Sequence, residues 1–184
     1  LLAWTARARE AIPPFVLIGD ADVLAARAQA LGLDVPIGQV ENAKQAPRLF
    51  QEALPVLPLK VGGKVEAGRP DQAAVPAVRE SIERAVALVQ QGAARAVVTN
   101  PISKAVLYGA GFSFPGHTEY LGALAAAKGR PLHPVMMLAS PTLKVVPVTI
   151  HVPLKDVPGL LTSDLILSTI EITAHDLGRY FGLK

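Results

Sequence analysis

The stretch that decides the fold is Phe15-Val16-Leu17-Ile18-Gly19-Asp20, which leads into the alanine-rich segment 21–31. A continuous apolar run closed by Gly-Asp is typical of a strand buried on both faces of a parallel sheet. The segment 21–31 is predicted to be a helix, which Asp20 caps and Gly32 ends. A buried strand followed directly by a helix is typical of α/β proteins.

Apolar and amphipathic segments continue to alternate along the chain. The segments 35–40 and 54–59 are apolar but contain prolines, so we expect edge strands or extended loops there. The clearest helix is predicted over about 71–91, because its apolar residues form one stripe and Glu80 and Arg84 form an i,i+4 pair on the other face.

The remaining elements follow from the same patterns. Strands are expected at 96–99, 135–139 and 143–150, the last two as an antiparallel pair. Helices are expected after Ser103 as far as Gly109, over 117–128, and from the Thr162-Ser163-Asp164 cap to about Phe181. The chain therefore predicts an α/β fold with a mostly parallel sheet sandwiched by helices.

Composition excludes several classes of function. The 184 residues are 51% hydrophobic and 18% charged, which argues against disorder. The sequence contains no run of eighteen apolar residues, so we expect no membrane span. The absence of cysteine excludes a disulfide scaffold and a thiol nucleophile. Lysines and arginines are scattered singly, so we expect no nucleic acid partner despite a net charge of +3. The composition fits a cytoplasmic protein.

The first polar segment of interest is 99–104, Thr-Asn-Pro-Ile-Ser-Lys. Thr99 and Asn100 leave a predicted strand, and Lys104 stands at the start of a predicted helix. Free N–H groups and a lysine there suit a phosphate or carboxylate. A capped turn with a solvated Lys104 explains the same residues.

Two further segments carry histidines. Gly116 permits close approach of the backbone, and His117 and Thr118 occupy the first turn of a predicted helix, where they bind a substrate or simply cap the helix. His151 follows a predicted strand directly and is either a metal ligand or a structural histidine. His133 and His175 are expected at the surface. No G-x-G-x-x-G motif supports a standard dinucleotide site.

Taken in order, T-N-P-I-S-K at 99–104, G-A-G-F-S-F-P-G-H-T-E-Y at 109–120, V-M-M-L-A-S at 135–140 and T-I-H-V-P-L-K-D-V at 149–157 resemble the 4-hydroxythreonine-4-phosphate dehydrogenase family of pyridoxal phosphate biosynthesis. The resemblance implies a two-domain subunit like isocitrate and isopropylmalate dehydrogenases, of which only part is present. On this interpretation residues 1–111 belong to the first α/β domain. Residues 112–184 start the second, with dimerisation and metal-site elements.

The resemblance also implies an activity. The family oxidises 4-phosphohydroxy-L-threonine with NAD and a divalent metal ion (Zn, Mg or Co) to a β-keto acid, which decarboxylates to 3-amino-2-oxopropyl phosphate. It implies a homodimer, substrate binding by His117 and Thr118, and metal binding by His151, the first of three such histidines. Lys104 matches a recurrent lysine of the family to which no role is assigned, and the residues themselves predict that Thr99, Asn100 and Lys104 lie near an anion or cofactor. The other two histidines are not in this chain, so the fragment alone is expected to be inactive.

Three alternatives stay open. A sister dehydrogenase of the family, acting on D-threonate or D-erythronate 4-phosphate, would share His117, Thr118 and His151. A phosphate acyltransferase of related fold would need no metal histidine. The fragment itself could also be a non-catalytic scaffold that only folds and dimerises.

Overall fold

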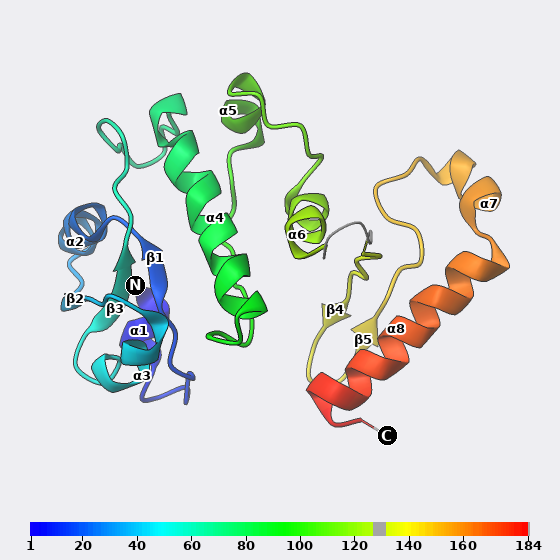
Figure 1. Cartoon of the computed structure of the whole chain (residues 1–184), viewed down its shortest axis with the longest axis horizontal. Coiled ribbons are helices and arrows are strands. Elements are labelled where there is room, and N and C mark those ends of the chain that lie inside the picture. The colour runs from blue at the N-terminus through cyan, green and yellow to red at the C-terminus, as the bar shows by residue number, and fades with distance from the viewer. Residues whose placement is uncertain (127–131, 184) are drawn as a thin grey trace. The chain divides into compact units, whose positions relative to one another are not determined.

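Three short parallel strands organise the first part of the chain. The computed structural model describes residues 1–126 and 132–183, and the chain divides into two compact units, Leu1–Pro131 and Leu132–Lys184. The elements of the first unit are α1 (Leu2–Ala6), β1 (Leu17–Gly19), α2 (Ala21–Ala30), β2 (Ile37–Gln39), η1 (Ala43–Gln45), α3 (Ala46–Leu49), β3 (Leu54–Pro58), η2 (Gln72–Ala74), α4 (Val75–Gln90), α5 (Lys104–Gly109) and α6 (His117–Ala125) (Figure 1).

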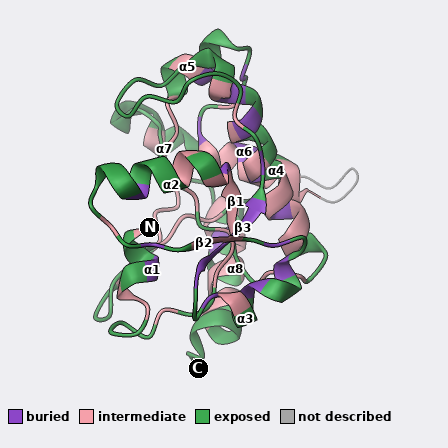
Figure 2. Ribbon diagram, turned by 90° about the vertical axis from the view of Figure 1, so that its left-hand side faces the viewer, coloured by how far each residue is buried: buried purple, intermediate pink, exposed green. Residues whose placement is uncertain are grey.

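The strand order is β1-β3-β2, with both pairings parallel. Helix α2 packs against β2, and α4 packs against β1 (Figure 1). The buried residues include Phe50, Leu54 and Val56, which are at most 1% exposed, and burial runs along β3 (Figure 2). The indole N–H of Trp4 donates to the Phe50 carbonyl oxygen at 2.9 Å and ties α1 to this core. The α/β fold predicted from the sequence is therefore confirmed.

The expectation that segment 54–59 lies at an edge of the sheet is wrong, because β3 is the central strand. The Leu54 N–H donates to the Pro36 carbonyl oxygen and the Val56 carbonyl oxygen accepts from the Val40 N–H, so the backbone polar groups of residues 54, 56 and 58 point toward β2. Pro58 lies beyond the last residue of β2 that pairs with β3. Pro55 points toward β1 instead, and it lies before the first β1 pair, Leu17 with Val56. At both prolines, the backbone therefore lacks an N–H only where no neighbouring strand would accept a hydrogen bond from it.

The strand predicted at 96–99 is also absent from the described structure, which is irregular from α4 to α5. Val98 is 96% exposed. A short apolar segment becomes a strand only when a neighbour pairs with it, and no strand within residues 1–126 does so.

Other predictions for the first unit hold. The Asp20 carboxylate accepts from the Asp22 N–H at 3.0 Å and caps α2. The residues of the apolar stripe of α4 are buried or half-buried, and Arg84 Nη1 lies 3.5 Å from Glu80 Oε1. Helix α6 ends at Ala125, whereas the predicted end at Lys128 and Gly129 lies outside the described residues.

A second cluster of buried side chains packs α4 against α5, α6 and the loop between them. Its members are Val75, Ile82, Leu107, Phe112 and Tyr120. The domain boundary predicted at 111/112 falls inside the first compact unit, because Phe112 and Tyr120 belong to this cluster. How these segments divide between the domains of an intact subunit stays a prediction.

The second unit contains β4 (Leu138–Ala139), β5 (Lys144–Val145), η3 (Leu154–Asp156), α7 (Val157–Leu160) and α8 (Ser163–Phe181). The antiparallel pairing of β4 and β5 was predicted, but both strands are shorter than 135–139 and 143–150. Thr162 Oγ1 accepts from Leu165 N–H at 3.2 Å, so the predicted cap of α8 is confirmed. Gly182 ends α8 with a φ of +64°.

Among the described residues, no helix by itself has the length and apolar character to cross a membrane. One bent pair, Leu154–Leu160 with Ser163–Phe181, reaches that length and composition only when the two segments are counted together.

Candidate functional site

The site is built around the start of α6. Gly116 is the N-cap, its backbone is extended, and no side chain caps the helix there. The Tyr108 hydroxyl donates to the Pro115 carbonyl oxygen at 3.1 Å, which links α5 to the loop that leads into α6. Glu119 lies in the first turn, where a carboxylate is favourable to the helix dipole.

Lys104 lies close to Gly116, at the start of α6. A β-carbon built on Gly116 would lie 3.3 Å from Glu119 Oε2 and 3.5 Å from Lys104 Nζ. Both charged groups therefore lie close to the backbone at the start of α6. The polar segments 99–104 and 114–119, which are separate in the sequence, meet here through Lys104 and Gly116.

The charges of Lys104 and Glu119 are not neutralised by ion pairs within residues 1–126. An ammonium group beside uncapped helix N–H groups suits a phosphate or carboxylate, and the nearby carboxylate suits a hydroxyl or amine donor. The arrangement can thus bind a small polar molecule that carries an anionic group.

His117 is the first residue of α6 and is half-buried. Its Nε2 atom is shielded from solvent, and among the described residues it has no hydrogen-bond partner. Leaving such an atom unsatisfied costs about 1–3 kcal/mol, so an unpaired buried nitrogen calls for an explanation such as a ligand. This atom is the observation in the structure that best fits the predicted substrate site.

The other predicted residues of the first unit are less well placed. Thr118 is half-buried, Thr99 is half-buried and Asn100 is exposed. Thr99 and Asn100 do not end a strand, and within residues 1–126 no side-chain hydrogen bond joins them to Lys104 or His117. The structure therefore places Lys104 near the start of α6, whereas Thr99 and Asn100 form no side-chain hydrogen bond to either Lys104 or His117 within residues 1–126.

His151 lies in the second unit, between β5 and η3, and is exposed. Its φ is +55°, a left-handed conformation that is uncommon for a residue other than glycine. His117 and His151 therefore belong to different compact units.

A metal centre needs several convergent ligands. The described parts of the chain contain no group of three or more His, Asp or Glu side chains placed to hold an ion. One exposed imidazole does not hold a zinc-like ion against water, so these residues alone do not fit a complete metal site.

Two sets of residues were missed by the sequence analysis. The first is Tyr120, whose hydroxyl donates to the Glu83 carboxylate of α4 at 2.7 Å, and the signal for it is its position one turn after His117. The second surrounds the buried Asp20 carboxylate, which accepts from Val61 N–H at 3.1 Å and lies 3.4 Å from Lys60 Nζ. The Val61 N–H, followed by the Asp22 N–H and Lys60, holds the pKa of Asp20 below its ordinary value against the opposing effect of burial.

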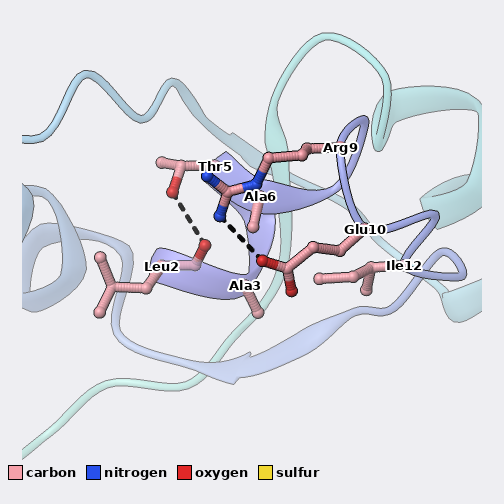
Figure 3. Close-up of a pocket in the computed structure, with 7 residues that line it drawn as sticks. All are labelled: Leu2, Ala3, Thr5, Ala6, Arg9, Glu10 and Ile12. Atoms are coloured by element: carbon pink, nitrogen blue, oxygen red, sulfur yellow. Dashed lines mark hydrogen bonds and ion pairs between the residues drawn. The ribbon is translucent and has the colours of Figure 1, made fainter.

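A separate pocket lies beside α1 and is lined by Leu2, Ala3, Thr5, Ala6, Arg9, Glu10 and Ile12 (Figure 3). Thr5 Oγ1 donates to the Leu2 carbonyl at 2.8 Å, and Arg9 pairs with Glu10 at 2.8 Å. None of the predicted site residues lines this pocket, and its charged groups already pair with each other.

The fold and the start of α6 define the class of protein. It is an α/β protein whose histidine, lysine and uncapped helix start suit a small anionic ligand, as in many enzymes of this fold class.

Comparisons with known proteins identify the family. The family model described as "Pyridoxal phosphate biosynthetic protein PdxA" matches residues 10–184, and the chain belongs to this family. A protein from Methylorubrum extorquens named 4-hydroxythreonine-4-phosphate dehydrogenase is 56% identical over 187 residues, which cover 100% of this chain and 53% of that protein. A relative of the same name from Xanthobacter autotrophicus is 49% identical, with 100% and 52% covered.

Solved structures agree with this assignment. A 4-hydroxythreonine-4-phosphate dehydrogenase from Burkholderia phymatum is similar with a TM-score of 0.73 and 32% identity, covering 85% of this chain and 46% of that one. The corresponding protein from Klebsiella pneumoniae gives a TM-score of 0.74 at 25% identity, covering 89% and 49%. The chain spans about half the length of the curated relatives it matches.

Proposed function

We propose that the whole protein, of which this chain spans about half the length of its relatives, is a dehydrogenase that oxidises 4-phosphohydroxy-L-threonine. In the proposed reaction, the carbon bearing the 3-hydroxyl gives a hydride to NAD and the hydroxyl loses its proton. The resulting β-keto acid then loses carbon dioxide to give 3-amino-2-oxopropyl phosphate. Membership of the family and the printed names of the relatives support this proposal.

The structural observation behind the proposed substrate site is the start of α6, where no side chain caps the helix and the His117 Nε2 atom has no hydrogen-bond partner among the described residues. In the proposed complex His117 and Thr118 bind polar groups of the substrate, and the Lys104 ammonium attracts an anionic group. Binding several groups at once would fix the orientation of the reacting hydroxyl, which is a large source of rate enhancement.

The cofactors and the assembly are part of the same proposal. We propose that the whole protein uses NAD and a divalent ion (Zn, Mg or Co), with His151 as one ligand and further ligands outside the described residues. The exposed position of His151 and its left-handed backbone are compatible with that role. We further propose a homodimer in the cytoplasm, in which residues 112–184 form much of the interface.

The direct test measures NADH formation by the full-length protein. We expect turnover of 4-phosphohydroxy-L-threonine, its loss in chelator-treated buffer and its return when a divalent ion is added. The chain of 184 residues alone should give no turnover and bind metal weakly.

The same assay separates the alternatives. Faster turnover of D-threonate or D-erythronate 4-phosphate would replace the proposed substrate with that of a sister dehydrogenase. Acyl transfer to phosphate without metal and without NADH formation would contradict the dehydrogenase proposal. Light scattering that shows a monomer at micromolar concentration would contradict the proposed homodimer.

A further inference from the structure

A buried tyrosine of α6 forms a hydrogen bond to a carboxylate of α4. The Tyr120 hydroxyl donates to Glu83 Oε1 at 2.7 Å, and the Tyr120 residue is only 3% exposed. Arg79 Nη2 lies 3.7 Å from the same carboxylate oxygen, so Glu83 is oriented by its own helix as well. The bond is part-buried, because the Glu83 side chain is 44% exposed, and a hydrogen bond to a charged group is among the stronger polar contacts in a protein.

The ring of Tyr120 also contacts the loop that precedes the helix. Its centroid lies 5.0 Å from that of Phe112, with the rings at 81°, and 5.1 Å from that of Phe114. These two phenylalanines belong to the segment 111–116, which ends at Gly116. One side chain therefore joins α4, the incoming loop and α6.

The hydrogen bond from Tyr120 to Glu83 is directional, whereas the apolar contacts of the Tyr120 ring are not. Apolar burial is non-directional and tolerates small rotations or shifts of a helix, whereas a short hydrogen bond does not. A second polar contact lies near the other end of α6, where Gln90 Nε2 donates to the Leu124 carbonyl at 3.0 Å. The two contacts, one part-buried and one exposed, join α6 to α4 at two points along α6.

The phenol is suited to a permanent role as donor. Burial, and after it the hydrogen bond to the Glu83 carboxylate, raise the pKa of Tyr120 above its ordinary value. The hydroxyl therefore stays protonated at neutral and moderately alkaline pH.

Tyr120 lies one turn after His117, in the same helix. We propose that Tyr120 and Glu83 are positioning residues, which act through α6 to hold His117 and Thr118 in register with the substrate. This inference rests on the proposed function and extends it to Glu83, which lies on a different helix from His117 and Thr118.

The test uses the full-length protein with four variants, Tyr120→Phe, Glu83→Ala, Glu83→Gln and the double variant Tyr120→Phe/Glu83→Ala. We expect KM for the phosphorylated substrate to rise about tenfold in Tyr120→Phe and Glu83→Ala, since small displacements of binding groups have effects of this order or larger. KM for NAD should stay unchanged. Glu83→Gln keeps an oxygen acceptor and should remain within about twofold of wild type.

The double variant provides a further criterion. Because both single changes break the same contact, the double variant should lose about as much as either single one rather than the product of the two losses. Glu80→Ala, which breaks the other i,i+4 ion pair of α4, is the matched control for Glu83→Ala and should leave KM unchanged.

Two results would overturn the inference. Both can be distinguished from a result that contradicts the proposed function itself. The first is a lowered Tm in Tyr120→Phe and Glu83→Ala with an unchanged substrate KM, which indicates a purely structural contact. The second is an equal rise of KM in Glu83→Gln and Glu83→Ala, which contradicts the role of the hydrogen bond. An inactive wild-type protein would instead contradict the proposed function itself.

Discussion

The two compact units of the chain differ most in how far their apolar side chains are buried. In the first, Phe50, Leu54 and Val56 are almost fully enclosed, and a second cluster surrounds Tyr120. In the second, Thr169 is the one fully buried residue among the described positions 132–183. Leu138, Leu143 and Leu167 each expose more than half of their surface.

This contrast shows that the first unit contains much of what stabilises it, whereas the second does not. A small unit without an apolar core gains little from folding alone, because burial has to offset the loss of chain entropy. The local features of the second unit are nevertheless well formed, as the capped helix α8 and the β4–β5 pair demonstrate. We infer that the exposed apolar side chains of this unit are suited to burial against other surfaces of the whole protein.

The largest effect on this contrast is expected from Phe50→Ala. Truncating a buried phenylalanine removes apolar burial and leaves a cavity, which costs about 3–5 kcal/mol. Urea denaturation of the chain, followed by far-UV circular dichroism and by the fluorescence of its single tryptophan, Trp4, should show this loss. A change below about 1 kcal/mol would mean that the first core contributes far less than its burial indicates.

The histidines of the two units allow a second comparison. In the full-length protein, His117→Ala and His151→Ala should each lower kcat/KM about 100-fold, the first by lost substrate alignment and the second by lost metal. Added divalent ion should partly restore His151→Ala and should not restore His117→Ala. Wild-type turnover by His151→Ala in chelator-treated buffer would refute the role given to that histidine.

The buried carboxylate at the end of β1 should give a smaller, pH-dependent effect. Asp20→Asn keeps an acceptor for the Asp22 N–H but loses a good acceptor for the Val61 N–H, which should cost about 1 kcal/mol at pH 7. Since the folded state lowers the pKa of Asp20, its contribution is complete above the unfolded pKa of about 3.9 and is lost as pH falls through the lower folded pKa. Denaturation curves of wild type and variant should therefore converge below about pH 4. A stability difference that persists unchanged far into the acid range would contradict this explanation.

The smallest effect is expected from Leu167→Ala in α8. This leucine is 56% exposed, so within the chain its truncation should change the free energy of unfolding by less than about 0.5 kcal/mol. The same substitution in the full-length protein should cost more if another surface covers α8, and comparing the two measurements sharpens the contrast between the units. Equal, negligible losses in both proteins would indicate that Leu167 stays exposed.

Local signals in the sequence predicted much of this structure. Asp20 before α2 and Thr162 before α8 act as caps because each bonds to N–H groups two or three residues away. The apolar stripe of α4 needs only the periodicity of one helix. The motif around Gly116 and His117 gave both the start of α6 and the resemblance to the family.

Features that depend on distant parts of the chain could not be predicted in this way. A central strand can contain prolines if its neighbours accept hydrogen bonds only from its other residues. The register of β1 and β2 against β3 decides this, and the positions of the prolines in the sequence do not reveal that register. The segment 96–99 has the composition of a strand but no partner within residues 1–126. The approach of Lys104 to Gly116 and the bond from Tyr120 to Glu83 likewise arise only when helices pack.

The prolines of β3 also determine how this protein will look to amide hydrogen exchange. The five-residue strand Leu54–Pro58 contains two prolines, so only Leu54, Val56 and Leu57 carry an exchangeable backbone proton there. Of these, the Leu54 proton is bonded to the Pro36 carbonyl at 2.7 Å. An exchange map would consequently record few protected sites in the most buried strand among the described residues. Isotope-edited infrared spectra of the strand's carbonyl groups, which proline retains, would report its opening more completely.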